Sequence, residues 1–160
     1  MTDYRGTLTD DDGVLVVSTT QQMALIGARG FGYDFPAELL ALMTDGRIVA
    51  WETGGEDEFS VAVVFAAEPP AGSRGAFRLS ALADDTGIVM PYSQFSYAAD
   101  CADGVVAVTP RLALRFPIPS GEHHVFLGAS PAGLSITITP AQHTLAPITN
   151  DLPLIRATGA

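Results

Sequence analysis

The chain repeats one pattern of turns and apolar runs. Each copy holds an acidic turn, an apolar run, a polar patch and a second apolar run. The copies are residues 10–26, with apolar runs at 14–17 and 23–26, and residues 84–98, with apolar runs at 88–90 and 95–98. A second Asp-Gly turn follows in each half. Short apolar runs bounded by turn residues are typical of strands. The repeat therefore predicts a sandwich of two related halves with its acidic loops gathered at one end.

Turn residues recur about every 8–12 positions along the rest of the chain, which is the spacing of a sandwich. Residues 112–116 alternate apolar and polar side chains, as a strand with one wet face does. We expect an all-β fold, an antiparallel β-sandwich of about ten to eleven short strands. The expected strands are 14–17, 23–26, 47–51, 59–65, 77–81, 88–90, 95–98, 105–109, 112–116, 124–127 and 134–138.

The first half is longer than the second because of an insertion, and this insertion carries a helix signal. Residues 34–36 can start a helix, good helix formers follow, and Gly46 lies just beyond its end. Leu39, Leu42 and Met43 share one face. We predict one short helix near 35–44 that closes an open end of the sandwich.

Length and composition predict a single domain over residues 1–160, with an irregular C-terminal strap from about 140. Apolar residues make up 48% of the chain, but no run approaches the roughly 18–20 residues of a membrane helix. The first residues show no signal peptide, and Cys101 is a single cysteine. These features predict a cytoplasmic protein without membrane contact.

The charge balance narrows the range of partners. Eight arginines and no lysine oppose 18 carboxylates, and the net charge is −10. Direct nucleic-acid binding needs a basic face, so we do not expect it. Two interpretations remain: the charge steers the protein to a basic protein partner, or it keeps an apolar domain soluble.

No catalytic or metal-binding motif is recognisable. His123 and His124 are consecutive on an expected strand, so they point to opposite faces and cannot readily bind one metal ion; one exposed and one partly buried histidine are expected. Carboxylates flank Cys101 and disfavour a thiolate nucleophile. We therefore expect no enzyme activity, no cofactor and no metal.

The acidic loops remain as candidates for binding. They can be solvated turns, a surface for a basic protein, or a Ca²⁺ site of the kind found in C2 domains, although consecutive aspartates lack the usual ligand spacing. The candidate partner-binding residues are Asp10, Asp11, Asp12, Glu56, Asp57, Glu58, Asp84 and Asp85.

From Val14 to Gly128 the chain resembles the competence protein J family, inhibitors of the DNA-entry nuclease. The resemblance begins with the strand and Gln-bearing patch at 15–22 and continues through 35–52, 59–65, 77–82 and 86–89. It ends with the hairpin Leu-Ala-Leu-Arg-Phe-Pro-Ile-Pro-Ser-Gly-Glu-His-His-Val-Phe-Leu at 112–127. The resemblance implies a nuclease-inhibitor or immunity-type binding role and identifies no interface residues.

Two functional hypotheses follow. The first is an acidic, non-catalytic binding protein that sequesters a basic partner such as a nuclease. The second is a sandwich domain with a small-molecule or structural role, as a homodimer. In this second case the polar patches 18–22 and 92–94, beside Trp51, would line a pocket.

Overall fold

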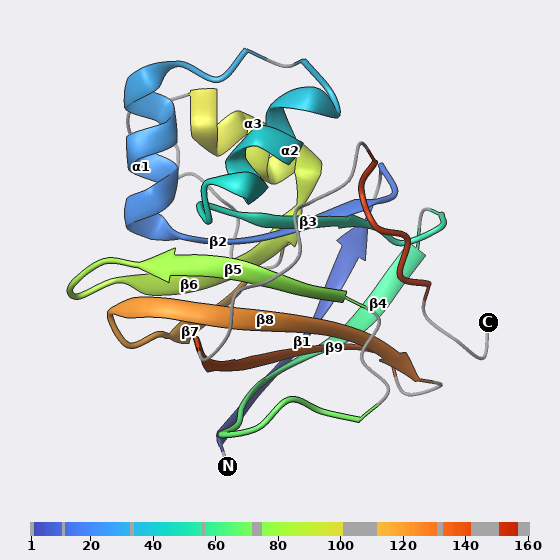
Figure 1. Cartoon of the computed structure of the whole chain (residues 1–160). Coiled ribbons are helices and arrows are strands. Elements are labelled where there is room, and N and C mark those ends of the chain that lie inside the picture. The colour runs from blue at the N-terminus through green and yellow to red at the C-terminus, as the bar shows by residue number, and fades with distance from the viewer. Residues whose placement is uncertain are drawn as a thin grey trace.

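The computed structural model describes residues 2–10, 12–32, 34–55, 57–71, 75–100, 112–130, 133–141 and 151–156. They form nine strands and three helices in two sheets and a helical layer (Figure 1). In chain order these are β1 (Thr2–Asp10), β2 (Val14–Thr19), α1 (Thr20–Arg29), α2 (Ala37–Thr44), β3 (Val49–Glu52), β4 (Asp57–Phe65), β5 (Gly75–Ala81), β6 (Thr86–Pro91), α3 (Tyr92–Asp100), β7 (Leu114–Pro117), β8 (Gly121–Ser130) and β9 (Gly133–Pro140).

The larger sheet has the order β1-β4-β9-β8-β5, and the smaller has β3-β2-β6-β7. Neighbouring strands are antiparallel except β4 and β9, which run parallel. The core includes Trp51 of the smaller sheet and Leu79 of the larger one, both almost completely buried. At one margin β5 approaches β3, and the Ser80 N–H donates to the Gly46 carbonyl at 2.8 Å. At the other margin β1 contacts β7.

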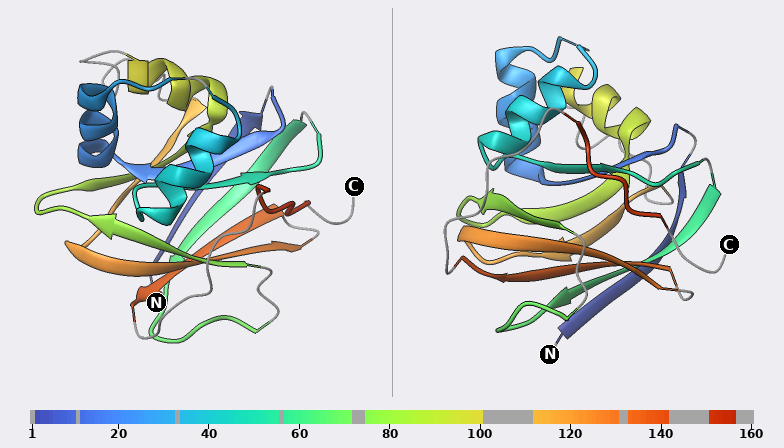
Figure 2. Two further views of the ribbon diagram at one scale, coloured as in Figure 1. Left: turned by 45° about the horizontal axis from the view of Figure 1, so that its top comes forward. Right: turned by 45° about the vertical axis from the view of Figure 1, so that its right-hand side comes forward.

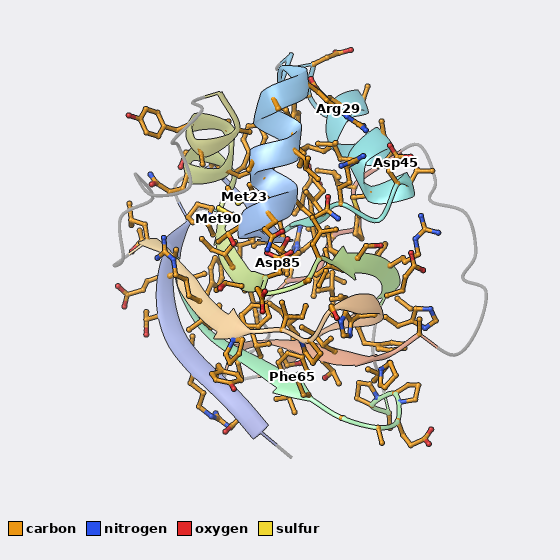
Figure 3. The ribbon with its side chains drawn as sticks, turned by 90° about the vertical axis from the view of Figure 1, so that its left-hand side faces the viewer. Met23, Arg29, Asp45, Phe65, Asp85 and Met90 are labelled. Carbon is orange, nitrogen blue, oxygen red and sulfur yellow. The ribbon has the colours of Figure 1, made fainter. Side chains whose placement is uncertain are left out.

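The three helices lie together on the outer face of the smaller sheet (Figures 1 and 2). Helix α1 contacts β6, and Met23 of α1 and Met90 of β6 are both completely buried (Figure 3). Helices on one side and a sheet on the other leave β2 without a solvent-facing side, and all six of its residues are buried. This explains why the strand is a continuous apolar run without alternation.

The prediction of an all-β sandwich with ten to eleven strands and one helix is wrong. The runs 23–26 and 95–98, expected to be strands, belong to α1 and α3. Their buried side chains, such as Met23 with Ile26 and Phe95 with Ala98, follow helical spacing, but runs of four residues are too short to reveal it. The Thr19 hydroxyl also accepts a hydrogen bond from the Gln22 N–H and begins α1 as an N-cap. The expected strand at 105–109 lies outside the described residues.

The internal repeat therefore consists of a turn, a strand and a helix. We call these the first unit (turn 10–13, β2 and α1) and the second unit (turn 84–85, β6 and α3). The two strands are antiparallel neighbours, with Thr19 opposite Gly87 and Leu15 opposite Pro91. Their helices contact each other.

The helix predicted near 35–44 is present as α2, with Leu39 and Met43 buried and Leu42 half-buried. It lies in the helical layer and contacts β3 of the smaller sheet and β5 of the larger sheet. None of the helices in the described ranges is long and apolar enough to span a membrane.

The described end of the chain, residues 151–156, lies along the outer edge of β3. The Glu52 N–H donates to the Pro153 carbonyl, and the Ile155 N–H donates to the Glu52 carbonyl, both at 2.8 Å. Leu152 and Ile155 are buried. Residues 151–156 thus pair the backbone groups of Glu52 at the outer edge of β3.

Candidate partner-binding surface

Two acidic turns lie side by side at one end of the molecule. The turn after β1 meets the turn before β4 because these strands pair to their ends, with Asp10 opposite Asp57. The same turn after β1 leads into β2 and also contacts the end of β3, where the Thr53 N–H donates to the Gly13 carbonyl at 2.9 Å. We call this surface the acidic end; its described acidic positions are Asp10, Asp12, Glu52, Asp57 and Glu58.

Asp12 is held by its own turn. Its Oδ1 accepts a hydrogen bond from the Val14 N–H at 3.2 Å, and Gly13 has a φ of 78°. An L-residue with a side chain rarely adopts this φ, so glycine is suited to the tight entry into β2. The bond fixes Asp12 relative to the sheet while its side chain remains exposed. Glu52 and Glu58 are exposed as well.

A pair of aromatic rings, Phe35 and Tyr92, borders the acidic end. Because Leu15 is opposite Pro91, the next residue of the second unit, Tyr92, lies beside the turn that contains Asp12. The rings of Phe35 and Tyr92 are 5.4 Å apart at 63°, and Phe35 is 44% exposed. Tyr92 also contacts the buried Phe95, at 6.4 Å between ring centroids. The exposed ring is therefore part of a cluster that reaches the core.

Carboxylates surround this aromatic pair. Burial raises the pKa of the Tyr92 phenol, and the negative charges of Asp12 and Glu38 raise it further. The Glu38 carboxylate is held in place by the Gly32 N–H, which lies 2.8 Å from both of its oxygens. Aromatic faces flanked by fixed carboxylates attract a cationic side chain.

One arginine lies at the margin of the acidic end. Arg156 of the strap packs against Gly54, where an added Cβ would be 2.7 Å from the arginine Cγ. Two ion pairs, between Arg5 and Asp3 and between Arg78 and Glu122, involve residues outside this surface. By composition the acidic end is negative, because its described positions include five acidic residues beside this one arginine.

The acidic turn of the second unit lies at the opposite end of the smaller sheet. Asp84 is exposed and has a φ of 57°. Asp85 is 7% exposed and lies at the start of α1 (Figure 3). Its carboxylate accepts four hydrogen bonds of 3.0 to 3.2 Å, from the N–H groups of Gln21, Leu82 and Thr86 and from the Thr20 hydroxyl. The prediction that all acidic loops gather at one end is wrong, and Asp85 is unavailable to a partner.

The pocket expected from the patches 18–22 and 92–94 does not form. The patches lie at opposite ends of the antiparallel pair β2–β6, and Trp51 is buried in the core. Ser18 and Gln22 are buried, and they bond to the Arg47 carbonyl and the Ser80 carbonyl.

The remaining candidates offer no second site of the expected kinds. Asp11, Glu56, Cys101 and His143 lie outside the described residues, as does the turn at 103–104. Both His123 and His124 are buried, which corrects the expectation that one is exposed. Within the described ranges no group of three or more potential ligand side chains could hold a metal ion. No local sequence signal indicates the aromatic pair, because Phe35 and Tyr92 are far apart along the chain.

Comparisons with known proteins address the fold. No family model and no curated protein matches the chain. Among solved structures, crocagin biosynthetic gene J is similar, with a TM-score of 0.60 and 10% sequence identity. The match covers 89% of this chain and 100% of that chain. At this identity the likeness concerns the fold alone.

Proposed function

We propose that this protein is a non-catalytic binding protein that sequesters a basic protein partner through the acidic end and the aromatic pair. The observation that carries the proposal is the placement of two acidic turns beside an exposed phenylalanine that is anchored to the core. A basic nuclease is the partner class that the resemblance to competence protein J implies. The proposal includes a cytoplasmic location.

Charge and aromatic surface would contribute differently to such a complex. A net charge of −10 accelerates encounter with a basic protein. Slow dissociation requires a few well-packed side chains, and these are commonly aromatic residues and arginines. An arginine of the partner that stacks on Phe35 would meet the carboxylates of Asp12 and Glu38 at the same place. The acidic end would then set the rate of association, and the aromatic pair the lifetime.

The test uses a purified DNA-entry nuclease as the probe and measures both binding and inhibition. The double variant Asp12→Arg with Glu58→Arg reverses two exposed charges at the acidic end. We expect it to weaken binding by about tenfold or more, mainly through slower association at low salt. Phe35→Ala should mainly speed dissociation.

Asp84→Arg is the matched control, because it reverses an exposed aspartate at the opposite end of the smaller sheet. It should leave the association rate within about twofold of the native value. Equal effects of the control and the double variant would contradict the location of the surface. Absence of binding by the native protein would contradict the nuclease as partner.

A further inference from the structure

A hollow lies at the far end of β4 from the acidic end. Because β4 and β9 run parallel, their last residues lie side by side, with Phe65 opposite Ile138. Figure 3 shows Phe65 on the larger sheet, away from the helical layer. The segment between β7 and β8 and the start of β8 add Pro119 and His123. The hollow has a volume of about 660 Å³, and its lining includes Phe65, Ala66, Pro119, His123, Ile138 and Pro140.

Several hydrogen-bond donors are absent from this lining or are already paired. Pro119 and Pro140 have no N–H group. The Ala66 N–H donates to the Ile138 carbonyl at 3.0 Å. The Thr139 hydroxyl donates to the Pro140 carbonyl at 3.3 Å. A ligand would therefore meet a largely apolar wall, to which it must present apolar surface of its own.

His123 is the exception. It is only 7% exposed, and its Nε2 lies 2.7 Å from the Pro119 carbonyl oxygen. A carbonyl oxygen only accepts, so Nε2 carries the hydrogen and donates it. In the neutral ring Nδ1 is then a hydrogen-bond acceptor. No hydrogen bond found within the described ranges uses Nδ1, and Nδ1 is not among their fully buried unpaired atoms. A mostly buried ring therefore keeps one acceptor that solvent or a ligand can reach.

A ligand that displaces solvent from the hollow must itself donate to Nδ1. A carboxylate cannot donate, and the lining contains no arginine to bind one, while Glu68 contributes a negative charge. Phe65 is itself part of an aromatic cluster, with ring centroids 6.2 Å from Tyr4 and 6.0 Å from Phe116. This cluster favours an aromatic ligand. We infer that the hollow binds a small phenol, whose ring packs on Phe65 and Ile138 and whose hydroxyl donates to Nδ1 of His123.

Two probes with the same ring, one with a hydroxyl donor and one with a methoxy group, test this site. 2-Naphthol has the ring and the hydroxyl, and 2-methoxynaphthalene keeps the ring without the donor. In a nuclear magnetic resonance titration of the full chain, 2-naphthol should bind saturably and shift amide signals of Ala66, His123 and Ile138. The methoxy probe should bind about tenfold more weakly, because it displaces solvent from Nδ1 and offers no donor in its place.

Two variants complete the experiment. His123→Leu removes the acceptor and should make the two probes bind equally. Ala66→Phe fills the hollow from its rim and should abolish binding of both. If His123→Leu fails to fold, the loss of binding in Ala66→Phe still tests the location of the site.

Equal affinity of the native protein for both probes would overturn the inference. So would shifts confined to other residues, or no saturable binding of 2-naphthol. None of these outcomes bears on the acidic end, which lies at the opposite end of β4.

Discussion

The acidic turns of the two units look alike in the sequence and differ in the structure. In the first unit Asp12 is exposed and bonds to an N–H group of its own turn. In the second unit Asp85 is buried and accepts hydrogen bonds from two different segments. One turn therefore presents charge to solvent, and the other holds a helix in place.

The antiparallel pairing of the two units explains this difference. It brings the turn of each unit next to the N-terminus of the other unit's helix. The start of a helix has N–H groups without intrahelical partners and a partial positive charge, so a carboxylate is stabilised there. Asp85 meets this requirement at α1, where it accepts from the Gln21 N–H at 3.0 Å. At α3 the corresponding neighbour of Asp12 is Tyr92, which begins the helix with an aromatic ring.

Asp85→Ala tests the buried half of this comparison and should have the largest effect. The substitution leaves three backbone N–H groups without their acceptor, and each such loss costs about 1–3 kcal/mol. We expect the free energy of unfolding in urea to fall by about 3 kcal/mol or more. Asp84→Asn is the control, because asparagine tolerates the left-handed conformation at an exposed position. A similar midpoint for the two variants would show that the bonds of Asp85 contribute little.

Leu39→Ala tests α2, which lies in the insertion that makes the first half of the sequence longer than the second. Leu39 is 1% exposed, and truncation of a buried leucine costs about 2–4 kcal/mol. Leu25→Ala on α1 is a matched control because Leu25 is 43% exposed, and it should cost less than about 1 kcal/mol. Equal unfolding midpoints would mean that α2 does not contribute to the core.

Gly13→Ala probes the entry into the exposed turn. Gly13 has a φ of 78°, so a Cβ here costs about 1–2 kcal/mol through backbone strain. No atom lies within 4 Å of that Cβ, so a steric clash would not add to the strain. Asp84→Gly is the reverse experiment in the other turn and should stabilise the protein by up to about 1 kcal/mol. Thermal unfolding of both variants checks the opposite signs.

The sequence allowed the turns and most of the strands to be predicted, because these depend on residues that are close along the chain. The expected strands 59–65 and 77–81 are part of β4 and β5. The same local view failed at 23–26 and 95–98. The polar patches 18–22 and 92–94 resemble turns between two strands, but they contain the starts of α1 and α3. The strand β2 is also buried on both faces, so it shows no alternation.

The candidate site was predictable only in part for the same reason. The carboxylates at 10–12 and 56–58 are recognisable in the sequence because each group has three consecutive acidic residues. The pairing of Asp10 with Asp57 brings these two turns together. The burial of Asp85 and the edge-to-face contact of Phe35 with Tyr92 depend on segments more than fifty residues apart. Such contacts follow from strand order, which the local pattern does not specify.

Asp12→Asn tests the exposed half of the comparison and should have the smallest effect on stability. Asparagine keeps an oxygen that can accept from the Val14 N–H, so the free energy of unfolding should change by less than about 0.5 kcal/mol. The lost charge should instead lower the pKa of Tyr92 toward its ordinary value. Burial, the larger cause of the raised pKa, remains, so the change should be partial.

The sign of the pH effect follows from linkage. A raised pKa in the folded protein gives stability that is complete below the unfolded pKa and is lost as pH rises through the folded value. In Asp12→Asn the pKa of Tyr92 in the folded protein should be lower. The loss of stability at alkaline pH should therefore be smaller and should end at a lower pH. An ultraviolet titration of tyrosinate, with Tyr92→Phe to assign the signal, measures the pKa. Asp84→Asn should leave it unchanged, since Asp84 lies at the other end of the smaller sheet. An equal response to both substitutions would mean that Asp12 does not act on the aromatic pair, and that the acidic end and the pair are separate surfaces.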